Sequence, residues 1–569
     1  MRTIDIEERP HESEAGMSHE TARPMEPLTL EHVKAPRTKF RLAAILTALY
    51  LALGIAALDQ TIMATSIPTI AAQLHSASGY VWIGSAYLLA NAAAGPIWAK
   101  CSDIWGRKPA LLGAVALFAG ASIMAALSVS MNMLIAARAL QGTAGGGLLQ
   151  LVFITISDLF SMRERVLYLG LTEVLWAITG GAGPLIGGAF TQLVSWRWCF
   201  WVNLPVCGTT FVLLFFYLDV HNPRTGLKDG LAAIDWFGTL SILGVIVMLL
   251  LGLDFGGAVF PWGSPTVICL LVFSVAMIGV FLFSEQRLAK YPLMPLAMFK
   301  SKSNCAVFLI GITQGMCYIP AEYYLPLYFQ SVKQASPLRS GILVLPITVS
   351  EGTFGIISGI VMHQTGRYRE VMWAGVFLIT VGTGLYISFD AYTSIARLVG
   401  VMLIGGSGCG LLFEAPIIAI QNTVSQADTA TATATFGMLR NIATSISIVL
   451  GGVIFQNSMA GKVELLQNAG INSTLVGAFT NGQAAANVEL VKTIQDLAQR
   501  NIVKEAFASS MRNMWYMYTA IAAVGLVAGI FIKHGHLSEE HTETKTGIEQ
   551  MTERVTVRYK DTAESEIAA

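Results

Sequence analysis

Four ionisable side chains lie inside long apolar stretches of the sequence, where a charge is costly to bury. Asp59 and Arg138 lie in the N-terminal half of the chain, and Glu322 and Glu351 lie in the C-terminal half. An ionisable group within a membrane-spanning segment is a functional candidate by default. A buried carboxyl group takes up or releases a proton when its surroundings change. We therefore predict that these four residues take part in proton coupling.

Asp59 and Arg138 are placed so that they could meet. Each lies about six residues from the same end of its apolar stretch. With a rise of about 1.5 Å per helical residue, the two side chains sit at a similar depth, and an ion pair is geometrically allowed. Two roles remain open for such a pair. It could load and release a proton as its balance of charge changes, or it could be a static contact that pins two helices together.

One face of the stretch that holds Arg138 is marked by three further residues. Gln141, Gly142 and Gly145 follow Arg138 at the spacing that places residues on one side of a helix. We expect this face to line a substrate cavity, although helix packing would also explain the glycines. Two aromatic residues are further candidates for the wall of an apolar cavity, with a lipid-facing position as the alternative: Tyr318 and Tyr323.

Other acidic residues lie at different depths. Glu322 falls in the outer half of its stretch and Glu351 near the middle of its own. Glu173 and Glu414 fall toward inner ends, where a carboxylate either titrates or simply reaches interfacial water.

The composition identifies the class of protein that must hold these groups. The chain has 569 residues, of which 54% are hydrophobic and 13% charged, against about 25% charged in an average soluble domain. This excludes a soluble globule, a secreted disulfide scaffold and a disordered protein. The net charge is zero, which gives no field to attract nucleic acid. The chain has seven cysteines and no C-x-x-C pair, so we expect free thiols. We expect no bound metal and no cofactor.

The apolar stretches are long enough to cross a bilayer as helices, which need about 20 residues each. We therefore expect an all-α, multi-pass membrane protein. Fourteen stretches are read as spans: 42–65, 80–99, 109–129, 132–156, 166–190, 198–218, 236–255, 265–284, 304–328, 340–362, 371–389, 395–419, 431–456 and 514–533.

The basic residues of the short connecting segments indicate the orientation. With the N-terminus inside, the inner segments carry seventeen Lys and Arg residues and the outer ones carry four, a strong positive-inside bias. Both tails are then cytoplasmic. The inner residues are Lys34, Arg37, Lys39, Arg41, Lys100, Arg107, Lys108, Arg163, Arg165, Arg224, Lys228, Arg287, Lys290, Lys300, Lys302, Arg367 and Arg369, and the outer ones are Arg197, Lys333, Arg339 and Arg397. A long polar outer loop, 457–513, contains the sequon at Asn472, a candidate glycosylation site.

A repeat relates the two halves of the chain. Gly106-Arg107, after the second span, matches Gly366-Arg367, after the tenth, and both pairs lie in short inner loops. The simplest account is a duplicated six-helix unit with two helices inserted between the copies. The predicted organisation is an N-terminal tail 1–41, a six-helix bundle 42–218, inserted helices and connectors 219–302, a second bundle 303–533 and a C-terminal tail 534–569.

Five motifs carry a resemblance to a known family. They are Asp103 to Lys108, Leu58 to Ile62 followed by Ile67-Pro68, Arg138 to Gly142 with Gly145 to Gly147, Gly183 to Gly188, and Trp196 to Pro205. In this order, and at these helices, they resemble motifs of the major facilitator superfamily, specifically its fourteen-helix drug:H⁺ antiporters. The resemblance covers about residues 40–533. The loop after the second span departs from the family pattern at Ala99 and Ile104, which argues against assuming a complete charge network there.

The resemblance implies a fold, a function and several residue roles. The fold would be two six-helix bundles plus two extra helices, and the function would be proton-driven efflux of amphipathic drugs, toxins or secondary metabolites by alternating access. The variants of the motifs look most like fungal members, which implies a monomer in the plasma membrane, with the vacuolar membrane as the alternative. Six residues would form a conformational latch: Asp103, Gly106, Arg107, Lys108, Gly366 and Arg367. Four would form the antiporter motif of the fifth span: Gly183, Pro184, Gly187 and Gly188.

Other functions were weighed against efflux. A siderophore or basic amino-acid transporter of the same fold is the main alternative, and a non-transporting receptor is a weaker one, because both tails are short. The chain has no G-x-x-x-x-G-K-S/T loop for ATP, and no H-E-x-x-H or G-x-S-x-G motif of an enzyme. We therefore expect a transporter whose partners are protons, lipid and a small organic substrate.

Overall fold

The protein is a bundle of long helices. The computed structural model describes residues 38–63, 66–74, 79–221, 223, 225–256, 260–289, 291–294, 296–480, 484–485, 487–539 and 546–547. Within these residues the regular structure is helical, and extended pairing is limited to two isolated bridges. The inner basic residues Lys34, Arg37, Arg224 and Lys290 lie outside the described residues, as do most of the two tails.

Each of the fourteen predicted stretches coincides with a helix. The N-terminal half comprises α1 (Lys39–Ile62), α3 (Gly79–Trp105), α4 (Arg107–Ala126), α5 (Met131–Leu159), α6 (Met162–Leu193) and α8 (Asn203–Tyr217), with the short α2 (Ile67–Gln73) and α7 (Trp198–Trp201). The middle comprises α9 (Leu227–Ala233), α10 (Trp236–Phe255) and α11 (Pro265–Phe283). The C-terminal half comprises α12 (Lys302–Ser331), α13 (Pro337–Thr365), α14 (Arg369–Tyr386), α15 (Ile395–Thr423), α16 (Thr429–Ala460) and α19 (Leu497–Ala528).

Twelve helices among the described residues are long and apolar enough to cross a membrane. The two predicted spans outside this set are α3 and α14. Helix α3 carries polar and small residues such as Asn91 and Pro96 within its apolar stretch, and α14 begins with the charged residues Arg369 and Glu370.

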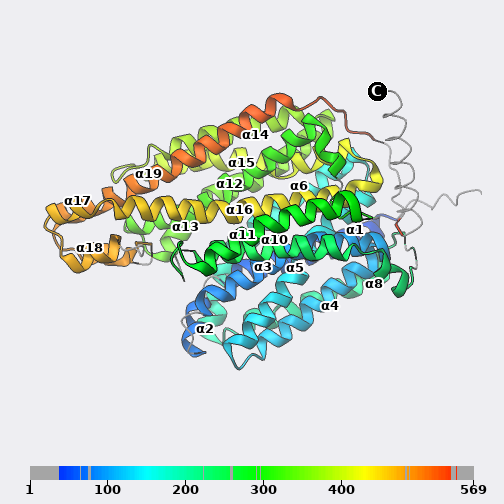
Figure 1. Cartoon of the computed structure of the whole chain (residues 1–569), viewed down its shortest axis with the longest axis horizontal. Helices are drawn as coiled ribbons and strands as arrows, with labels where there is room; N and C mark the ends of the chain where they lie inside the picture. The colour runs from blue at the N-terminus through cyan, green and yellow to red at the C-terminus, as the bar shows by residue number, and fades with distance from the viewer. Residues whose placement is uncertain are drawn as a thin grey trace, which may run out of the picture.

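The two halves pack side by side, and the largest apolar cluster contains residues of both. In Figure 1 most of the N-terminal half, blue to cyan, lies below the C-terminal half, which runs from green to red. Several helices begin at a serine whose hydroxyl accepts a hydrogen bond from a backbone N–H of the first turn, as Ser130 does for α5 and Ser301 for α12. Such caps mark the points where the chain turns back into the next helix.

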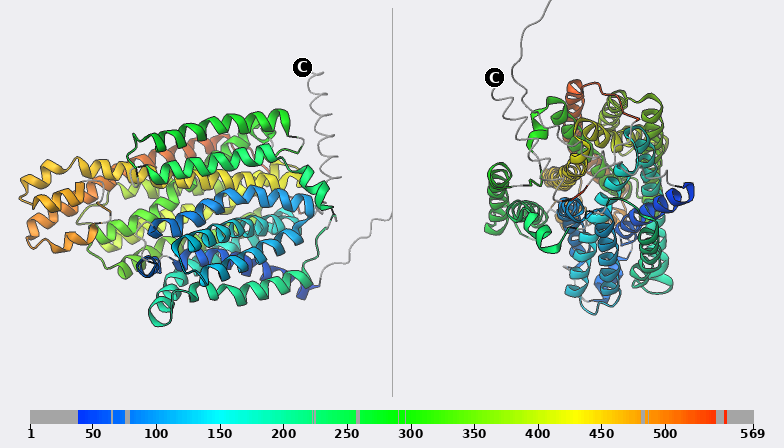
Figure 2. Two further views of the ribbon diagram at one scale, coloured as in Figure 1. Left: turned by 60° about the horizontal axis from the view of Figure 1, so that its bottom comes forward. Right: turned by 90° about the vertical axis from the view of Figure 1, so that its right-hand side faces the viewer.

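The inserted pair α10 and α11 lies on one flank of the bundle, outside both halves (Figure 2). Ile246 of α10 packs in one apolar cluster with Ala92 of α3, Phe281 of α11 and Met438 of α16. The pair therefore contacts one helix of each half. That the two helices were inserted between duplicated six-helix units stays a prediction.

The segment predicted as a polar outer loop is largely helical instead. Helix α16 continues to Ala460, two short helices follow, and α19 begins at Leu497 rather than at 514. The short helices are α17 (Val463–Asn468) and α18 (Ser473–Thr480). Val476 and Phe479 lie one turn apart on α18 and are buried in a common core with Phe507 of α19. Figure 1 shows α17 and α18 at the end of the molecule opposite the described ends of the chain.

The inner connectors lie together at the other end. Arg41, at the start of α1, donates from Nε to the carbonyl of Tyr217 at 3.1 Å and pairs with Asp219 at 3.4 Å. The backbone N–H of Gly547 donates to the carbonyl of Asp103 at 2.8 Å. Both described ends of the chain therefore lie on the side that the positive-inside bias predicts to be cytoplasmic.

Candidate functional site

Asp59 and Arg138 form an ion pair that is enclosed inside the N-terminal half. Nη1 of Arg138 donates to Oδ2 of Asp59, and the side chain of Asp59 has no exposed surface. The ion pair that the sequence allowed is therefore present. Asp59 faces neither lipid nor open solvent in this conformation, because helices α1, α4, α5 and α8 surround it.

Three neutral polar side chains complete the surroundings of Asp59. Oδ1 of Asp59 accepts from Nε2 of Gln141 at 3.2 Å and from Nδ2 of Asn203 at 3.1 Å. Both amide groups also reach Oγ of Ser122, at 2.9 Å and 3.4 Å. Ser122 and Asn203 were not predicted. Asn203 could have been noticed in the sequence, because it is an amide residue in an otherwise apolar segment. Ser122 could not, because a single serine in α4 gives no such signal.

The guanidinium of Arg138 has partners on every side. It lies 4.5 Å from the centroid of the Tyr87 ring, donates from Nε to the carbonyl of Ile83 at 3.2 Å, and donates from Nη1 to Oε1 of Gln141 at 3.0 Å. A proton that joined Asp59 would cancel its charge and leave Arg138 buried without a counter-ion, which is strongly unfavourable. Protonation of Asp59 therefore favours a rearrangement of these helices.

Gly142 and Gly145 do not line a cavity, contrary to the prediction. A Cβ atom at Gly142 would overlap the carbonyl oxygen of Tyr87, and one at Gly145 would overlap the Tyr87 hydroxyl. Gln141, on the same face, is fully buried. The face therefore serves the close approach of α3 and α5, which is the packing alternative.

The antiporter motif lies in α6, which runs without interruption through Pro184. A Cβ atom at Gly183 would overlap the hydroxyl of Thr61, and that hydroxyl donates to the carbonyl of Thr179 at 3.0 Å. The carbonyl of Gly187 accepts from the hydroxyl of Thr191 at 2.7 Å, and Gly188 has open space around it. The motif thus brings α6 close to α1 at Gly183.

In the C-terminal half, the Tyr318 hydroxyl and Oε2 of Glu351 form a buried hydrogen bond between α12 and α13. Glu322 lies one turn further along α12, on the same side as Tyr318, and is partly exposed. Tyr323 does not join them. It is 60% exposed and lies about 140° around the helix from Tyr318, so its predicted place in the same cavity wall is not supported.

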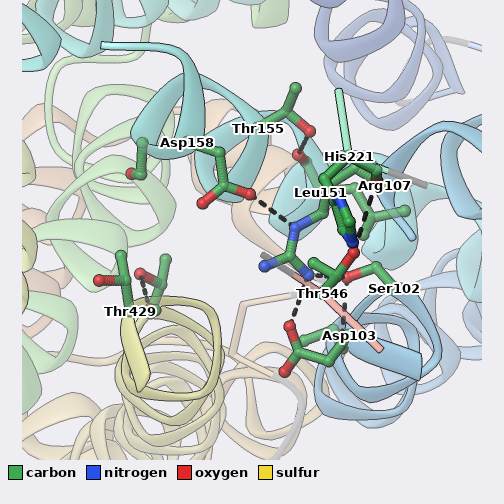
Figure 3. A network of polar contacts seen from close by, with 12 residues as sticks. Ser102, Asp103, Arg107, Leu151, Thr155, Asp158, His221, Thr429 and Thr546 are labelled. Carbon is green, nitrogen blue, oxygen red and sulfur yellow. Dashed lines mark hydrogen bonds and ion pairs between the residues drawn. The ribbon is translucent and has the colours of Figure 1, made fainter. Parts of the chain in front are cut away.

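Two of the predicted latch residues, Asp103 and Arg107, form a buried charge network with Asp158 of α5 (Figure 3). Nη1 of Arg107 donates to Oδ1 of Asp103 at 2.6 Å, and Nε donates to Oδ2 of Asp158 at 2.7 Å. Gly106 adopts a φ of 95°, a conformation that only glycine takes readily, and this turns the chain between α3 and α4. Lys108 donates to the carbonyl of Phe215 at 2.6 Å.

The charged partner of Asp103 in this conformation, Arg107, belongs to its own half. Asp158 of α5 was not predicted to take part. The network forms despite the departures at Ala99 and Ile104. Ala99 takes part through its backbone carbonyl, which does not depend on the side chain and accepts from the Ser102 hydroxyl at 2.7 Å.

The matching loop of the C-terminal half shares the glycine and the arginine but has no acidic residue at the position that corresponds to Asp103. Gly366 adopts a φ of 66° and ends α13. Arg367 is exposed, and its backbone pairs with that of His536. His363 stands where the repeat places Asp103 in the first half, and its ring Nδ1 contacts the carbonyl of Arg163 at 2.9 Å. The duplication therefore preserves the turn and not the charge network.

Comparison with known proteins identifies the family. The family model described as Major Facilitator Superfamily matches residues 49–448. The chain belongs to the major facilitator superfamily. It is therefore a membrane transporter and not an enzyme, as the five motifs implied.

Curated fungal members of the superfamily are similar along nearly the whole chain. The efflux pump dotC of Dothistroma septosporum is 45% identical over 508 residues, which cover 89% of this chain and 87% of that protein. The MFS-type transporter ppz2 of Metarhizium majus is 42% identical over 90% of this chain and 88% of its own length. The efflux pump FUS6 of Gibberella fujikuroi is 32% identical over 89% and 91%.

Solved superfamily structures share the fold. The human organic anion transporter MFSD10 aligns with a TM-score of 0.53 at 14% identity, over 86% of this chain and 99% of its own. The proton:xylose symporter XylE aligns with a TM-score of 0.54 at 14% identity, over 91% and 100%.

The two halves of this major facilitator protein are closed against each other at their cytoplasmic ends. A Cβ atom at Gly170 of α6 would lie 3.2 Å from the carbonyl of Gly355 in α13, and one at Gly359 would lie 2.8 Å from the carbonyl of Val166. Nearer the cytoplasm, Arg163 donates to the carbonyls of His363 at 2.5 Å and Gln364 at 2.7 Å. We call this contact of α6 with α13 and α15 the cytoplasmic gate.

The outer ends of the same helices are apart. Gly180 and Gly188 of α6 and Gly341 of α13 have nothing within 4 Å of an added Cβ, and Leu185 of α6 is 66% exposed. The hydrogen bonds that join the two halves in the described residues lie toward the cytoplasmic ends of α5, α6, α13 and α15. The protein therefore has its cytoplasmic gate closed in this conformation.

Proposed function

We propose that this chain is a proton-coupled efflux transporter that exports amphipathic organic compounds, namely drugs, toxins or secondary metabolites, by alternating access. The similarity at 45% identity to a protein named as an efflux pump supports export as the direction. The observation that carries proton coupling is the enclosed pair of Asp59 and Arg138, because a single proton on Asp59 removes the counter-ion of a buried arginine.

The proposed cycle follows from this pair. In the outward-open state a proton reaches Asp59 from outside, and the loss of its charge destabilises the packing of α1, α4, α5 and α8 around Arg138. The halves then rock so that the cavity faces the cytoplasm, where the proton leaves and the substrate binds. Glu351, held by Tyr318, is a second proton acceptor in the opposite half. Glu322, one turn from Tyr318, is a third.

We also propose that all fourteen helices span the membrane. Helices α3 and α14 lie within the two halves, where α3 packs on α5 and α14 packs on α15. Buried charges such as Asp103 are satisfied by ion pairs there, so a lower hydropathy does not prevent crossing. An even number of spans leaves both tails in the cytoplasm, and the plasma membrane is the compartment that fits export from the cell.

The test is an accumulation measurement in cells that carry or lack the protein. We expect the deletion strain, screened by mass spectrometry, to retain a metabolite that the parent strain exports. We expect a protonophore to produce the same retention in the parent. Asp59→Asn should abolish export while membrane expression stays normal. Lower accumulation in the deletion strain would indicate an importer of the same fold, and export that survives the protonophore would refute proton coupling.

A further inference from the structure

Two carboxyl groups that the proposed cycle does not use meet inside the cytoplasmic gate. Glu173 comes from α6 of the N-terminal half, and Glu414 comes from α15 of the C-terminal half. Each is 1% exposed, and their side chains lie within hydrogen-bonding reach of each other. The contact therefore joins the two halves of the protein, and it exists only while the gate is closed.

The carboxylate oxygens of this pair lack donors. Both oxygens of Glu173 and Oε2 of Glu414 have no hydrogen-bond donor among the described residues. Oε1 of Glu414 receives one long contact of 3.4 Å from the hydroxyl of Thr172, which already donates to the carbonyl of Leu169 at 2.6 Å. Two oxygens from two carboxylates cannot bond to each other unless one group carries a proton.

The other titratable groups that face the pair are committed elsewhere. Glu351 of α13 accepts from the Tyr318 hydroxyl and, at 3.6 Å, from the thiol of Cys409 on α15. Tyr50 of α1 donates its hydroxyl proton to the carbonyl of Tyr168 at 2.9 Å.

Arg440 of α16 is the cation that faces the pair. Its guanidinium lies 4.4 Å from the centroid of the Phe413 ring and donates to the Phe413 carbonyl at 3.4 Å. It makes no ion pair with either carboxylate within the described ranges. No neighbouring group therefore supplies the donor that the pair lacks.

The pair is sealed by the gate itself. A Cβ atom at Gly355 of α13 would lie 2.7 Å from Cγ of Glu173, and one at Gly352 would lie 3.1 Å from Cβ of Ala177 on α6. These glycines let α13 close directly over Glu173. Separation of α6 from α13 and α15 would admit water to both carboxyl groups, and water can accept the proton.

We propose that Glu173 and Glu414 form a proton-binding site that locks the cytoplasmic gate. With the gate closed, one carboxyl group keeps its O–H and donates it to a carboxylate oxygen of the other. When the gate opens, that hydrogen bond breaks, the proton passes to water, and both groups become hydrated carboxylates. The proton is taken from the cytoplasm and returned to it, so it is separate from the proton proposed to drive export. An acidic cytoplasm therefore favours the closed gate, and an alkaline one favours opening.

The first experiment is infrared spectroscopy on the full-length protein in lipid nanodiscs. We expect the C=O stretching band of a protonated carboxylic acid to lose intensity in Glu173→Gln and in Glu414→Gln. The exposed Glu370 of α14 provides the control, because Glu370→Gln should leave the band unchanged. An unchanged band in both gate variants would overturn the proposal.

The second experiment measures the gate directly, by electron–electron distances between spin labels at Pro109→Cys and Glu370→Cys. Both positions are exposed at cytoplasmic helix ends, one in each half. Three accessible native cysteines are first replaced by serine: Cys101, Cys269 and Cys305.

In the otherwise wild-type protein we expect the population with the short label-to-label distance, which is the closed gate, to fall as pH rises. In Glu173→Gln/Glu414→Gln we expect this population to stay the same at every pH. A wild-type gate that ignores pH, or a double variant that responds as the wild type does, would refute the lock. Because neither measurement uses substrate or transport, a failure of the efflux proposal would not affect either result.

Discussion

Asn203, at the first position of α8, donates a hydrogen bond of 3.1 Å to the same oxygen of Asp59 that accepts from Gln141. The second oxygen of Asp59 is held by Arg138. Each oxygen of this buried carboxylate therefore has a fixed donor, and the donors come from two helices. The ionised form of Asp59 is held by a neutral amide as well as by the arginine, which was the only partner that the sequence suggested.

The role of Asn203 can be measured by removing its amide. Asn203→Ala should lower the free energy of unfolding by about 1–3 kcal/mol, because a buried acceptor loses one of its donors. We expect a lower melting temperature of the purified protein and a loss of export larger than that of Thr209→Ala. Thr209 is an exposed residue of the same helix, so it serves as the matched control. Equal effects of the two changes would exclude a specific role for Asn203.

The charges of Asp59 and Arg138 should prove interdependent. Arg138→Gln alone leaves Asp59 buried without its cation, and a broken buried pair costs about 3–5 kcal/mol. The double variant Asp59→Asn/Arg138→Gln removes both charges, so it should recover much of the stability while export remains absent. Thermal unfolding and an export assay on the same preparations separate the two effects. Export in the double variant would show that the pair is only structural.

The close approach of α3 and α5 predicts a contrast between two glycines. Gly142→Ala should destabilise the protein by about 1–3 kcal/mol, because the new methyl group would overlap the backbone of Tyr87. Gly120→Ala in α4 should be neutral or slightly stabilising, because nothing lies within 4 Å of its Cβ position. The measurement is the shift in melting temperature. A neutral Gly142→Ala would mean that the two helices are not in tight contact.

Asp158 should matter as much as Asp103 for the stability of the loop between α3 and α4. Asp158→Asn removes a buried partner of Arg107, whose side chain is 2% exposed, and we expect a loss of about 3–5 kcal/mol. Glu370→Gln, which affects a surface pair with Arg369 at 3.5 Å, should cost about 0–1 kcal/mol. Denaturant or thermal unfolding compares the two. If Asp158→Asn left the stability unchanged, Asp103 alone would account for the stabilising pair with Arg107.

The sequon at Asn472 should carry a glycan when the protein is made in a secretory pathway. Asn472 is exposed between the two short outer helices, and its side chain accepts from the backbone N–H of Thr474 at 2.9 Å. We expect peptide N-glycosidase to increase the mobility of the protein on a gel. Thr474→Ala should abolish that shift and Ser473→Ala should retain it. A shift that persists in Thr474→Ala would place the glycan elsewhere.

The sequence predicted those features that depend on long patterns. Stretches of about 20 apolar residues locate the helices because the bilayer requires that length. The insertion of two helices between duplicated units, inferred from a repeat of two loops, stays a prediction. Asp59 and Arg138 stood out because charge is rare within such stretches. Ser122 did not, since uncharged polar residues are common in membrane helices, and the amide of Asn203 was a weaker signal than a charge.

The remaining errors have a similar physical origin. In the sequence, a helix face rich in glycine is compatible with a cavity wall and with a packing surface. Only the position of Tyr87 in the structure shows that Gly142 lies on a packing surface. The hydropathy of the outer segment is low, which predicts a loop. Its helices bury only single residues, such as Phe479 and Phe507, against each other, and their other side chains are exposed. Tertiary contacts of this kind leave no signal in the average composition of a window.

The position of α10 and α11 makes the protein asymmetric toward the lipid. The two halves meet along two lateral seams, α6 with α13 and α3 with α16, and the inserted pair covers the second seam only (Figure 2). Among the described helices, none outside the two halves lies over the first seam. Once the cytoplasmic gate opens, a compound that dissolves in the inner leaflet would have a single sideways entrance, between α6 and α13, because the inserted pair separates the opposite seam from the acyl chains.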